Sequence, residues 1–179
     1  MLLLDLGSFV AGKRHGYGYD DPISLQCLER MRYDMLVIGE GELIRGLEGV
    51  DSLLGGRDLR VVSNNVFEPT SGRTRYEPYR IVKAGRLKVG ITGMANARGG
   101  LARRLAESQE IAVTDGIHES REALAALRKK KVDLTVLVAR GGLAAARALA
   151  DSVPGYDVIL TGEGRASSLT PEKHGTSIV

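Results

Sequence analysis

Hydrophobic residues in this chain gather in short apolar runs, and most stretches between the runs carry apolar residues at helical spacing. A run such as Met35–Ile38, which ends at a glycine, is typical of a strand that is buried on both faces. The sequence predicts strands at Leu2–Leu4, Met35–Ile38, Leu59–Val62, Tyr79–Lys83, Leu87–Thr92, Ile111–Val113, Leu134–Val138 and Val158–Leu160.

Helices are predicted between these strands. Asp20 or Asp21 can cap a helix with Pro22 in its first turn, and the helical spacing continues to Arg32. The same spacing predicts that Cys27, the single cysteine, packs in the core. Further helices are predicted over residues 42–54, 120–131 and 141–152. Strands that alternate with helices indicate a layered α/β fold, and we expect a single domain over residues 1–179.

The composition narrows the function only slightly. Apolar residues make up 43% of the 179 positions and charged residues 26%, as in an ordinary globular domain. No apolar run approaches the ~20 residues that a membrane-spanning helix needs. The 25 basic and 22 acidic residues are spread along the chain and leave a net charge of +3. With only 4% aromatic residues, this pattern argues against nucleic acid as a partner.

The candidate site is expected in four loops. In α/β folds, functional residues cluster in the loops that leave the carboxyl ends of the strands. Four loops follow predicted strands and carry glycines together with polar or charged residues: Leu6–Ser8, Gly39–Glu42, Ala139–Gly142 and Gly162–Arg165.

Six segments in series, which include these loops, resemble the motifs of the 5'-nucleotidase and 2',3'-cyclic phosphodiesterase type of calcineurin-like metallophosphoesterase. They are Leu2–Gly12 (lllDaGDxxxG in that family), Tyr33–Leu43 (gYDa-x-GNHEfD), Ser63–Val66 (aaNv), Pro78–Gly93 (PYxixexxGxkigviGl), Asp133–Gly142 (DxvixLsHxG) and Val153–Arg165 (vpgiDvIigGHsH). The order and spacing match over almost the whole chain.

The resemblance implies a sandwich of mixed β-sheets flanked by helices. It also implies a binuclear site in which two divalent metal ions polarise a phosphoryl oxygen and activate water. The family's first strand, with its Asp-x-His metal motif, would precede Met1, so we expect a truncated, incomplete domain that lacks this strand. The resemblance further implies periplasmic location or export, although the N-terminal residues do not form a signal peptide.

The chain departs from the family at every metal-binding or catalytic position that it covers. Ser8 stands where the resemblance places a bridging Asp, and Gly41 stands for the catalytic His. Glu40 replaces a metal-binding Asn, Arg140 a metal-binding His, and Glu163 and Arg165 two more. Arginine is permanently protonated and cannot ligate a metal ion. We therefore expect a degenerate site with no metal cofactor.

His15, His118 and His174 lie outside the motif positions, and each is interpreted as an exposed residue rather than a metal ligand. The glycines of the loops, Gly7, Gly39, Gly142 and Gly162, are retained. The sequence therefore predicts that loop geometry is kept while the ligands are lost.

Three readings of function remain open at this stage. The first is a nucleotidase-like domain that is catalytically inactive, in which Arg140 and Arg165 pair with Glu40 and Glu163 where the metals were. The second is a metal-independent module of a larger exported protein, which binds phosphate or a nucleotide at the two arginines or contacts another domain. The third is a residual phosphoester hydrolase with an altered metal site.

Overall fold

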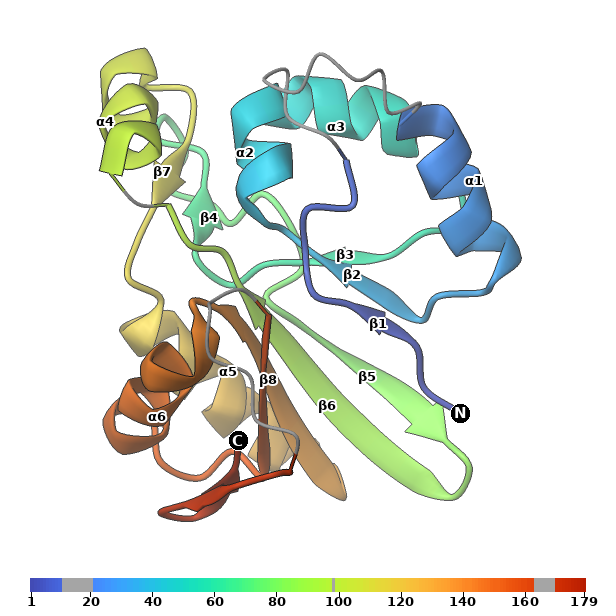
Figure 1. Ribbon diagram of the computed structural model, residues 1–179, viewed down its shortest axis with the longest axis vertical. Coiled ribbons are helices and arrows are strands. Elements are labelled where there is room, and N and C mark those ends of the chain that lie inside the picture. Colours follow the sequence, from blue (N-terminus) through green and yellow to red (C-terminus); the bar gives the residue numbers. More distant parts are fainter. Residues whose placement is uncertain (11–20, 98, 163–169) are drawn as a thin grey trace.

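The computed structural model describes residues 1–10, 21–97, 99–162 and 170–179, and it contains two main β-sheets with helices outside each (Figure 1). The first sheet has three parallel strands in the order β1-β2-β3. Its elements are β1 (Leu4–Asp5), β2 (Met35–Val37) and β3 (Val61–Val62), covered by α1 (Asp21–Arg30), α2 (Glu40–Arg45) and α3 (Leu47–Leu54). The helix predicted over residues 42–54 is two helices, because Gly46, with φ of 88°, separates them.

The second sheet has six strands in the order β10-β11-β9-β8-β6-β5 and is mixed. Strands β6, β8, β9 and β11 run parallel, whereas β5 and β10 run antiparallel to their neighbours. The elements are β5 (Tyr79–Ala84), β6 (Leu87–Met94), α5 (Ile117–Lys129), β8 (Leu134–Arg140), α6 (Gly142–Ser152), β9 (Val158–Gly162), β10 (Lys173–His174) and β11 (Ser177–Ile178).

A smaller unit lies beside these sheets. It consists of the antiparallel pair β4 (Val66–Phe67) and β7 (Ala112–Val113), together with α4 (Gly99–Ser108) (Figure 1). The sequence predicted a strand at Ile111–Val113 but assigned no element to residues 95–109, because the small and basic residues there give no clear period. The structure shows that Gly99–Ser108 within this stretch form a helix whose Leu101 and Leu105 pack into the core.

Alternation along β8 shows how the layers are assembled. Val136 and Val138 point toward the first sheet and pack in one cluster with Met35 and Val37 of β2. The residues between them, such as Leu137, point the other way into the cluster that α6 covers. The molecule is therefore a sandwich of two sheets with helices outside each, which confirms the predicted layered α/β class. That residues 1–179 form one incomplete domain stays a prediction.

The prediction for Cys27 is wrong. Its side chain is exposed, and α1 buries only Asp21 and Leu25 completely. Ile23 of α1 and Met31, just after its end, are also 56% and 57% exposed. The helix contacts the core along a narrower stripe than its sequence suggests, so helical spacing alone overestimates its buried face.

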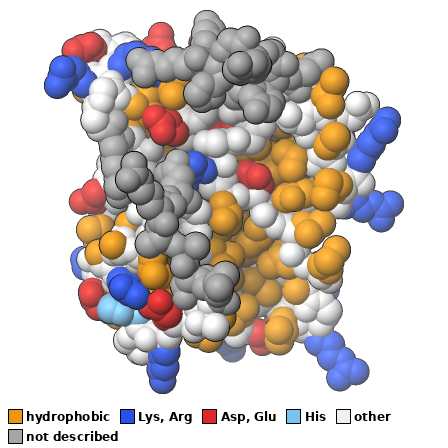
Figure 2. Space-filling view, in the orientation of Figure 1, with side chains coloured by type: hydrophobic (Ala, Val, Ile, Leu, Met, Phe, Trp, Pro, Cys, Tyr) orange, Lys and Arg blue, Asp and Glu red, His pale blue; other side chains and the backbone are white. Residues whose placement is uncertain are grey.

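Apolar side chains also reach the surface of the molecule. Figure 2 shows them gathered over the region of β1, β5 and β6. Leu2, Leu4 and Leu6 are among the partly buried residues that pack against the cluster between the sheets. The sandwich therefore packs less completely at β1 than at β8, whose central residues are fully buried.

Candidate functional site

The loops that leave β1, β2 and β8 meet at one end of the sandwich, as the sequence predicts. Direct hydrogen bonds join the loop after β1 to Glu42 of α2, the helix that follows β2, and to Arg140 at the end of β8. The amide of Gly141, after β8, donates to the carbonyl oxygen of Gly162 at the end of β9. The carboxyl ends of these four strands thus define the candidate site.

Glu42 joins the first two loops. Its carboxylate is fully buried and accepts hydrogen bonds from three backbone amides. Oε2 lies 2.8 Å from the nitrogen of Ser8 and 2.7 Å from that of Gly39, and Oε1 lies 2.8 Å from the nitrogen of Val10. Each of these amides would otherwise be a buried or partly buried donor without a partner, so this one side chain fixes the course of both loops.

Burial raises the pKa of Glu42 above its usual value, and the three amide hydrogen bonds oppose that increase. Asp5 behaves similarly: burial raises the pKa of its carboxyl, and its hydrogen bond from Gly7 and the charge of Arg140 oppose the increase. Asp5 Oδ1 accepts from the amide of Gly7 at 2.8 Å. Asp5 and Glu42 therefore both hold the backbone of the loop after β1 in place through hydrogen bonds.

The same two loops approach each other too closely for side chains at two glycines. A Cβ on Gly39 would lie 2.6 Å from the nitrogen of Ser8, and one on Gly41 would lie 2.2 Å from the carbonyl oxygen of Val10. The amide of Gly41 also donates to Ser8 Oγ at 3.2 Å. Gly41 is thus required by the present loop geometry, in addition to standing where the family resemblance places a histidine.

Arg140 connects the second sheet to the first loop. It is the last residue of β8 and follows the parity of Val136 and Val138, so its side chain points toward the first sheet. It is 9% exposed, and Nη1 donates to the carbonyl oxygens of Leu6 at 3.2 Å and Gly7 at 2.8 Å. The permanent positive charge of Arg140 therefore lies between the end of β8 and the loop after β1.

The other predicted site positions are Ser8, Glu40, Glu163 and Arg165, and only the first two belong to the described residues. Ser8 is exposed and adopts a left-handed backbone with φ of 62°. Glu40 is exposed at the start of α2, and no ion pair within 4.0 Å joins it to Arg140, both of them described residues. Glu163 and Arg165 lie outside the described residues. The predicted pairing of arginines with Glu163 therefore stays a prediction.

His118 and His174 each face an acidic side chain. His118 is an exposed residue of α5 that faces Glu122, and His174 Nε2 lies 2.9 Å from Asp151 Oδ1 on α6. His15 lies outside the described residues.

Two asparagine side chains, Asn65 and Asn96, connect the ends of strands next to the candidate site. The side chain of Asn65 donates to the carbonyl oxygens of Ala95 and Thr114 at 2.9 and 2.8 Å, and its Oδ1 accepts from the amide of Ala95. It thereby ties β3 to the ends of β6 and β7. Asn96 Nδ2 donates to the carbonyl oxygen of Arg140 at 3.1 Å and extends this support to β8.

A hollow of about 510 Å³ opens beside Arg140. Arg140, Asn96, Thr114, Asp115 and Ser152 contribute its polar lining, and Ala97, Val113 and the other α6 residues contribute apolar surface. Its size lies within the range of ~300–1,000 Å³ that is usual for small-molecule sites. The hollow thus has one basic residue, Arg140, and one acidic residue, Asp115, in its lining.

The described residues do not fit a two-metal centre. Among them, no group of three or more His, Cys, Asp or Glu side chains is placed to hold a metal ion. At the positions discussed above, Gly41 has no side chain and Arg140 offers no lone pair. The described residues therefore do not supply the ligands that a metal-assisted hydrolytic step would need.

Sequence reasoning missed the role of Glu42, Asp5 and Asn65. All three belong to segments that resembled the family motifs, and none was expected to carry the site. Their signal was present: each is a polar residue at or just beyond the end of an apolar strand, where a buried side chain needs partners.

Comparison with known proteins confirms the resemblance. The chain is 25% identical over 192 residues to the trifunctional nucleotide phosphoesterase YfkN of Bacillus subtilis, covering 90% of this chain and 13% of YfkN. It is 24% identical over 179 residues to a 2',3'-cyclic-nucleotide 2'-phosphodiesterase/3'-nucleotidase of Salmonella typhimurium, covering 90% of this chain and 28% of that enzyme. No family model matches the chain.

Solved structures agree with the fold. The sulfate thiohydrolase SoxB of Thermus thermophilus, solved with glycerol, has a TM-score of 0.85 at 20% identity and covers 99% of this chain and 32% of its own. The crystal structure of YfkN, a calcineurin-like phosphoesterase, has a TM-score of 0.74 at 23% identity and covers 89% of this chain and 57% of its own. The chain is thus similar to nucleotide phosphoesterases and has the calcineurin-like fold.

These comparisons correct one expectation. The expectation of no metal cofactor is wrong, because the phosphoesterases that the chain resembles are metal-dependent. Ser8 and Arg140 stand where the resemblance places metal ligands, and Gly41 stands where it places the catalytic histidine. None of the described helices is both long and apolar enough to cross a membrane.

Proposed function

We propose that this nucleotidase-like phosphoesterase domain keeps its loop framework, does not catalyse two-metal phosphoester hydrolysis, and binds phosphate or a nucleotide without turnover. The observation that carries the proposal is the placement of Arg140. Its guanidinium donates to the carbonyl oxygens of Leu6 and Gly7, and Arg140 is one of the residues beside the hollow at the end of β8.

Loss of turnover is inferred from three positions. The resemblance requires a bridging carboxylate at Ser8, an imidazole at Gly41 and another at Arg140, and none of these groups is present. Gly41 cannot regain a side chain without a shift of the loop, because a Cβ there would meet the Val10 carbonyl. The framework supports this reading, since Glu42 and Asp5 hold the loops without any metal ligand.

Binding of an anion is inferred from charge and geometry. A guanidinium offers five donors in a fixed fork that suits phosphate oxygens. The resemblance puts Arg165 at the same cleft, so we propose that it shares this role. We also propose that Glu163 pairs with these arginines when no anion is bound. This pairing would reduce the electrostatic repulsion between the two neighbouring guanidinium groups.

The test combines turnover and binding in the full 179-residue protein. AMP, 3'-AMP and 2',3'-cyclic AMP are incubated with Mg²⁺, Mn²⁺ or Zn²⁺, and released phosphate and products are measured. Phosphate and AMP are titrated by calorimetry, and metal content is measured on the purified protein. We expect no product above the rate without protein, and binding of both ligands.

Variants locate the binding. Arg140→Gln should weaken phosphate binding about tenfold, because a charged hydrogen bond contributes ~1.5–3 kcal/mol. Arg140→Lys keeps the charge and should lose less. Arg147→Gln is the matched control, since Arg147 is an exposed arginine of α6 paired with Glu172. Metal-dependent hydrolysis of any substrate would overturn the loss of turnover, and unchanged binding in Arg140→Gln would overturn the anion site.

The resemblance also implies export. We include periplasmic location in the proposal on that basis alone, together with further domains, since the chain spans only 13–28% of the two curated relatives described above. Fractionation of the source cells with an antibody against this domain would contradict it by finding the protein in the cytoplasm.

A further inference from the structure

Strand β5 ends the six-stranded sheet and leaves one of its edges open. In the strand order it has β6 on one side only, and at six residues it is the longest strand that ends a sheet among the described residues. The strands β1, β3 and β10, which end sheets as well, have two residues each. Figure 1 shows β5 at the outer side of its sheet. An open strand of this length can pair with another strand.

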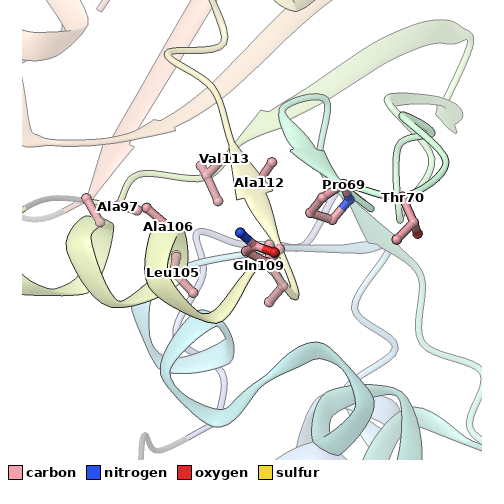
Figure 3. Close-up of a pocket in the computed structure, with 10 residues that line it drawn as sticks. Pro69, Thr70, Ala97, Leu105, Ala106, Gln109, Ala112 and Val113 are labelled. Atoms are coloured by element: carbon pink, nitrogen blue, oxygen red, sulfur yellow. The ribbon is translucent and has the colours of Figure 1, made fainter.

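The edge of β7 differs from that of β5. β7 has only two residues, and α4 lies against it. A hollow of about 610 Å³ is lined by both elements, and Ala106, Gln109 and Ala112 belong to this lining (Figure 3). A strand added there would gain few main-chain hydrogen bonds, because β7 is so short. The edge of β5 is therefore the one better suited to strand pairing.

The pairing of β5 with β6 shows which main-chain groups are open. The two strands form a hairpin that is closed by Ala84 and Leu87 across a two-residue turn. Hydrogen-bonded pairs alternate along an antiparallel ladder, so Lys83 is not bonded to its partner Lys88. The bonds of Lys88 agree, because its N–H donates to Asp133 Oδ2 and its carbonyl oxygen accepts from the Asp133 amide. The N–H and C=O of Lys83 therefore point away from β6.

The same alternation applies to Ile81 and Tyr79, whose N–H and C=O groups also point to the open side of β5. Among the described residues, the main chain of Ile81 and Lys83 makes no hydrogen bond outside the β5–β6 ladder. Ile81 is 36% exposed, and Lys83 is exposed as well. The edge thus offers a donor and an acceptor at every second residue, as a neighbouring strand requires.

We propose that a second copy of this chain pairs with β5, so that two copies form one continuous sheet about a two-fold axis at Ile81. The two β5 strands run antiparallel, and Ile81 faces Ile81 of the second copy. Tyr79 and Lys83 face Lys83 and Tyr79 of that copy, and each of these pairs exchanges two main-chain hydrogen bonds. The contact is the same on both copies and closes after two. Pairing of this kind does not depend on anion binding at Arg140.

The charged residues of β5 favour this register over its neighbours. In a register centred on Lys83 or on Arg80, that residue would lie directly opposite its own copy, and like charges placed in this way are destabilising. In the register centred on Ile81, the ammonium group of Lys83 instead meets the ring of Tyr79, which permits a cation–π contact. Like charges are thus kept apart and the central contact is apolar.

The hairpin turn limits the register further. A pair centred on Val82 would place Tyr79 opposite Gly85, which lies in the turn with φ of 64°. That register would form fewer hydrogen bonds, whereas the one centred on Ile81 keeps its hydrogen-bonded residues within β5. It also sets the aliphatic stem of Arg80 across from the half-buried side chain of Val82.

The surface beside the edge also fits a second copy. Figure 2 shows apolar side chains gathered over β1, β5 and β6. Because the two-fold axis is perpendicular to the sheet, the second copy places the same apolar surface next to this one on the same face. The apolar area in contact with water then decreases, which favours the pair.

Sedimentation velocity on the full 179-residue protein tests the pair without any variant. The mass should rise with concentration, from that of one chain at low micromolar toward that of two chains near millimolar concentration. The mass of one chain throughout would overturn the proposal. A mass that rises beyond two copies would overturn the closed two-fold arrangement.

Charge changes at Ile81 locate the axis. Ile81→Lys should weaken the pair at least about tenfold, because two like charges would face each other, and Ile81→Glu should do the same. A mixture of the two variants should associate more tightly than either variant alone, a result that requires residue 81 to face its own copy. Ile23→Lys, at an isoleucine of α1 that is 56% exposed, is the control and should pair like wild type. Unweakened pairing of both Ile81 variants, or no gain on mixing, would refute the β5 contact.

Hydrogen exchange on the wild-type protein decides the matter if the variants do not fold. The amides of Ile81 and Lys83 should exchange quickly at low concentration and slowly at high concentration, since only pairing gives them acceptors. The amide of Val82, which bonds to β6, should exchange slowly at both concentrations. Exchange at Ile81 and Lys83 that does not change with concentration would contradict pairing through β5.

Discussion

The buried carboxylate of Glu42 accepts a hydrogen bond of 2.8 Å from the backbone amide of Ser8, which lies 34 positions earlier in the chain. Two further amides, from Val10 and Gly39, share the same carboxylate. This contact joins the loop after β1 to the loop after β2 and sets where Ser8 and Gly41 lie. Substitutions at this junction are therefore expected to change the stability of the protein.

Glu42→Ala should destabilise the protein by at least about 3 kcal/mol, because three amides would lose their acceptor at ~1–3 kcal/mol for each that stays buried. Urea unfolding followed by circular dichroism measures the change. Glu48→Ala, at an exposed acid of α3, is the control and should lie within ~0.5 kcal/mol of wild type. Equal effects of the two changes would show that Glu42 does not organise the loops.

The pH dependence of stability follows from the raised pKa of Glu42. Because the folded protein binds this proton more tightly than the unfolded chain, its contribution to the free energy of unfolding is fully present below the unfolded value of 4.5. That contribution is lost as pH rises through the folded pKa. Wild type should therefore gain stability relative to Glu42→Gln as pH falls from neutrality to about 4.5.

Glu68 is a control for the pH dependence of stability, because its pKa is shifted in the opposite direction to that of Glu42. Hydrogen bonds from Arg75 and Ser71 lower the pKa of this exposed carboxyl, so its contribution is present above 4.5 and is lost as pH falls through the lowered value. Glu68→Gln should thus change the pH slope with the opposite sign to Glu42→Gln, or leave it unaltered. A Glu42→Gln profile parallel to that of wild type would contradict the assigned shift.

Gly41→Ala should destabilise the protein by more than about 2 kcal/mol, since its Cβ would lie 2.2 Å from the Val10 carbonyl oxygen and the loop would have to move. Gly41→His, which restores the residue implied by the resemblance, should destabilise at least as much and should not confer hydrolysis. Thermal unfolding and phosphate release measure the two effects. A stable, active Gly41→His protein would refute the steric argument.

Gly100→Ala provides a matched glycine in α4, where an added Cβ would meet nothing within 4 Å. It should stabilise the protein by ~0.5–1 kcal/mol through helix propensity. A loss of stability at this position would show that glycine replacement is harmful in general, and the effect at Gly41 would then carry no information about the loops.

Gly93→Ala tests how closely the two sheets approach. A Cβ at this position of β6 would lie 2.7 Å from Cγ1 of Val37 and 3.1 Å from the carbonyl oxygen of Val62. Overpacking of this kind costs ~1–3 kcal/mol. Pairing the change with Val37→Ala, which removes the clashing methyl groups, should recover part of the loss, and double-mutant unfolding measures the coupling. Additive effects would show that the sheets separate easily.

The sequence by itself determined the layers and the position of the site. Buried strands are predicted from apolar runs such as Met35–Ile38 and Leu134–Val138, and parallel strands place their following loops at one end. Local pattern suffices for these features because each depends on a few neighbouring residues.

Only the tertiary structure decided which polar side chains hold the loops and which face of a helix is buried. Glu42 meets Ser8 across 34 positions, and Asn65 meets Thr114 across 49, so no local period records either contact. Cys27 shares the helical spacing of a buried face and is nonetheless exposed, because burial depends on what packs against α1. Long-range packing therefore decides which side chains of the predicted elements are buried and which of them hold the site.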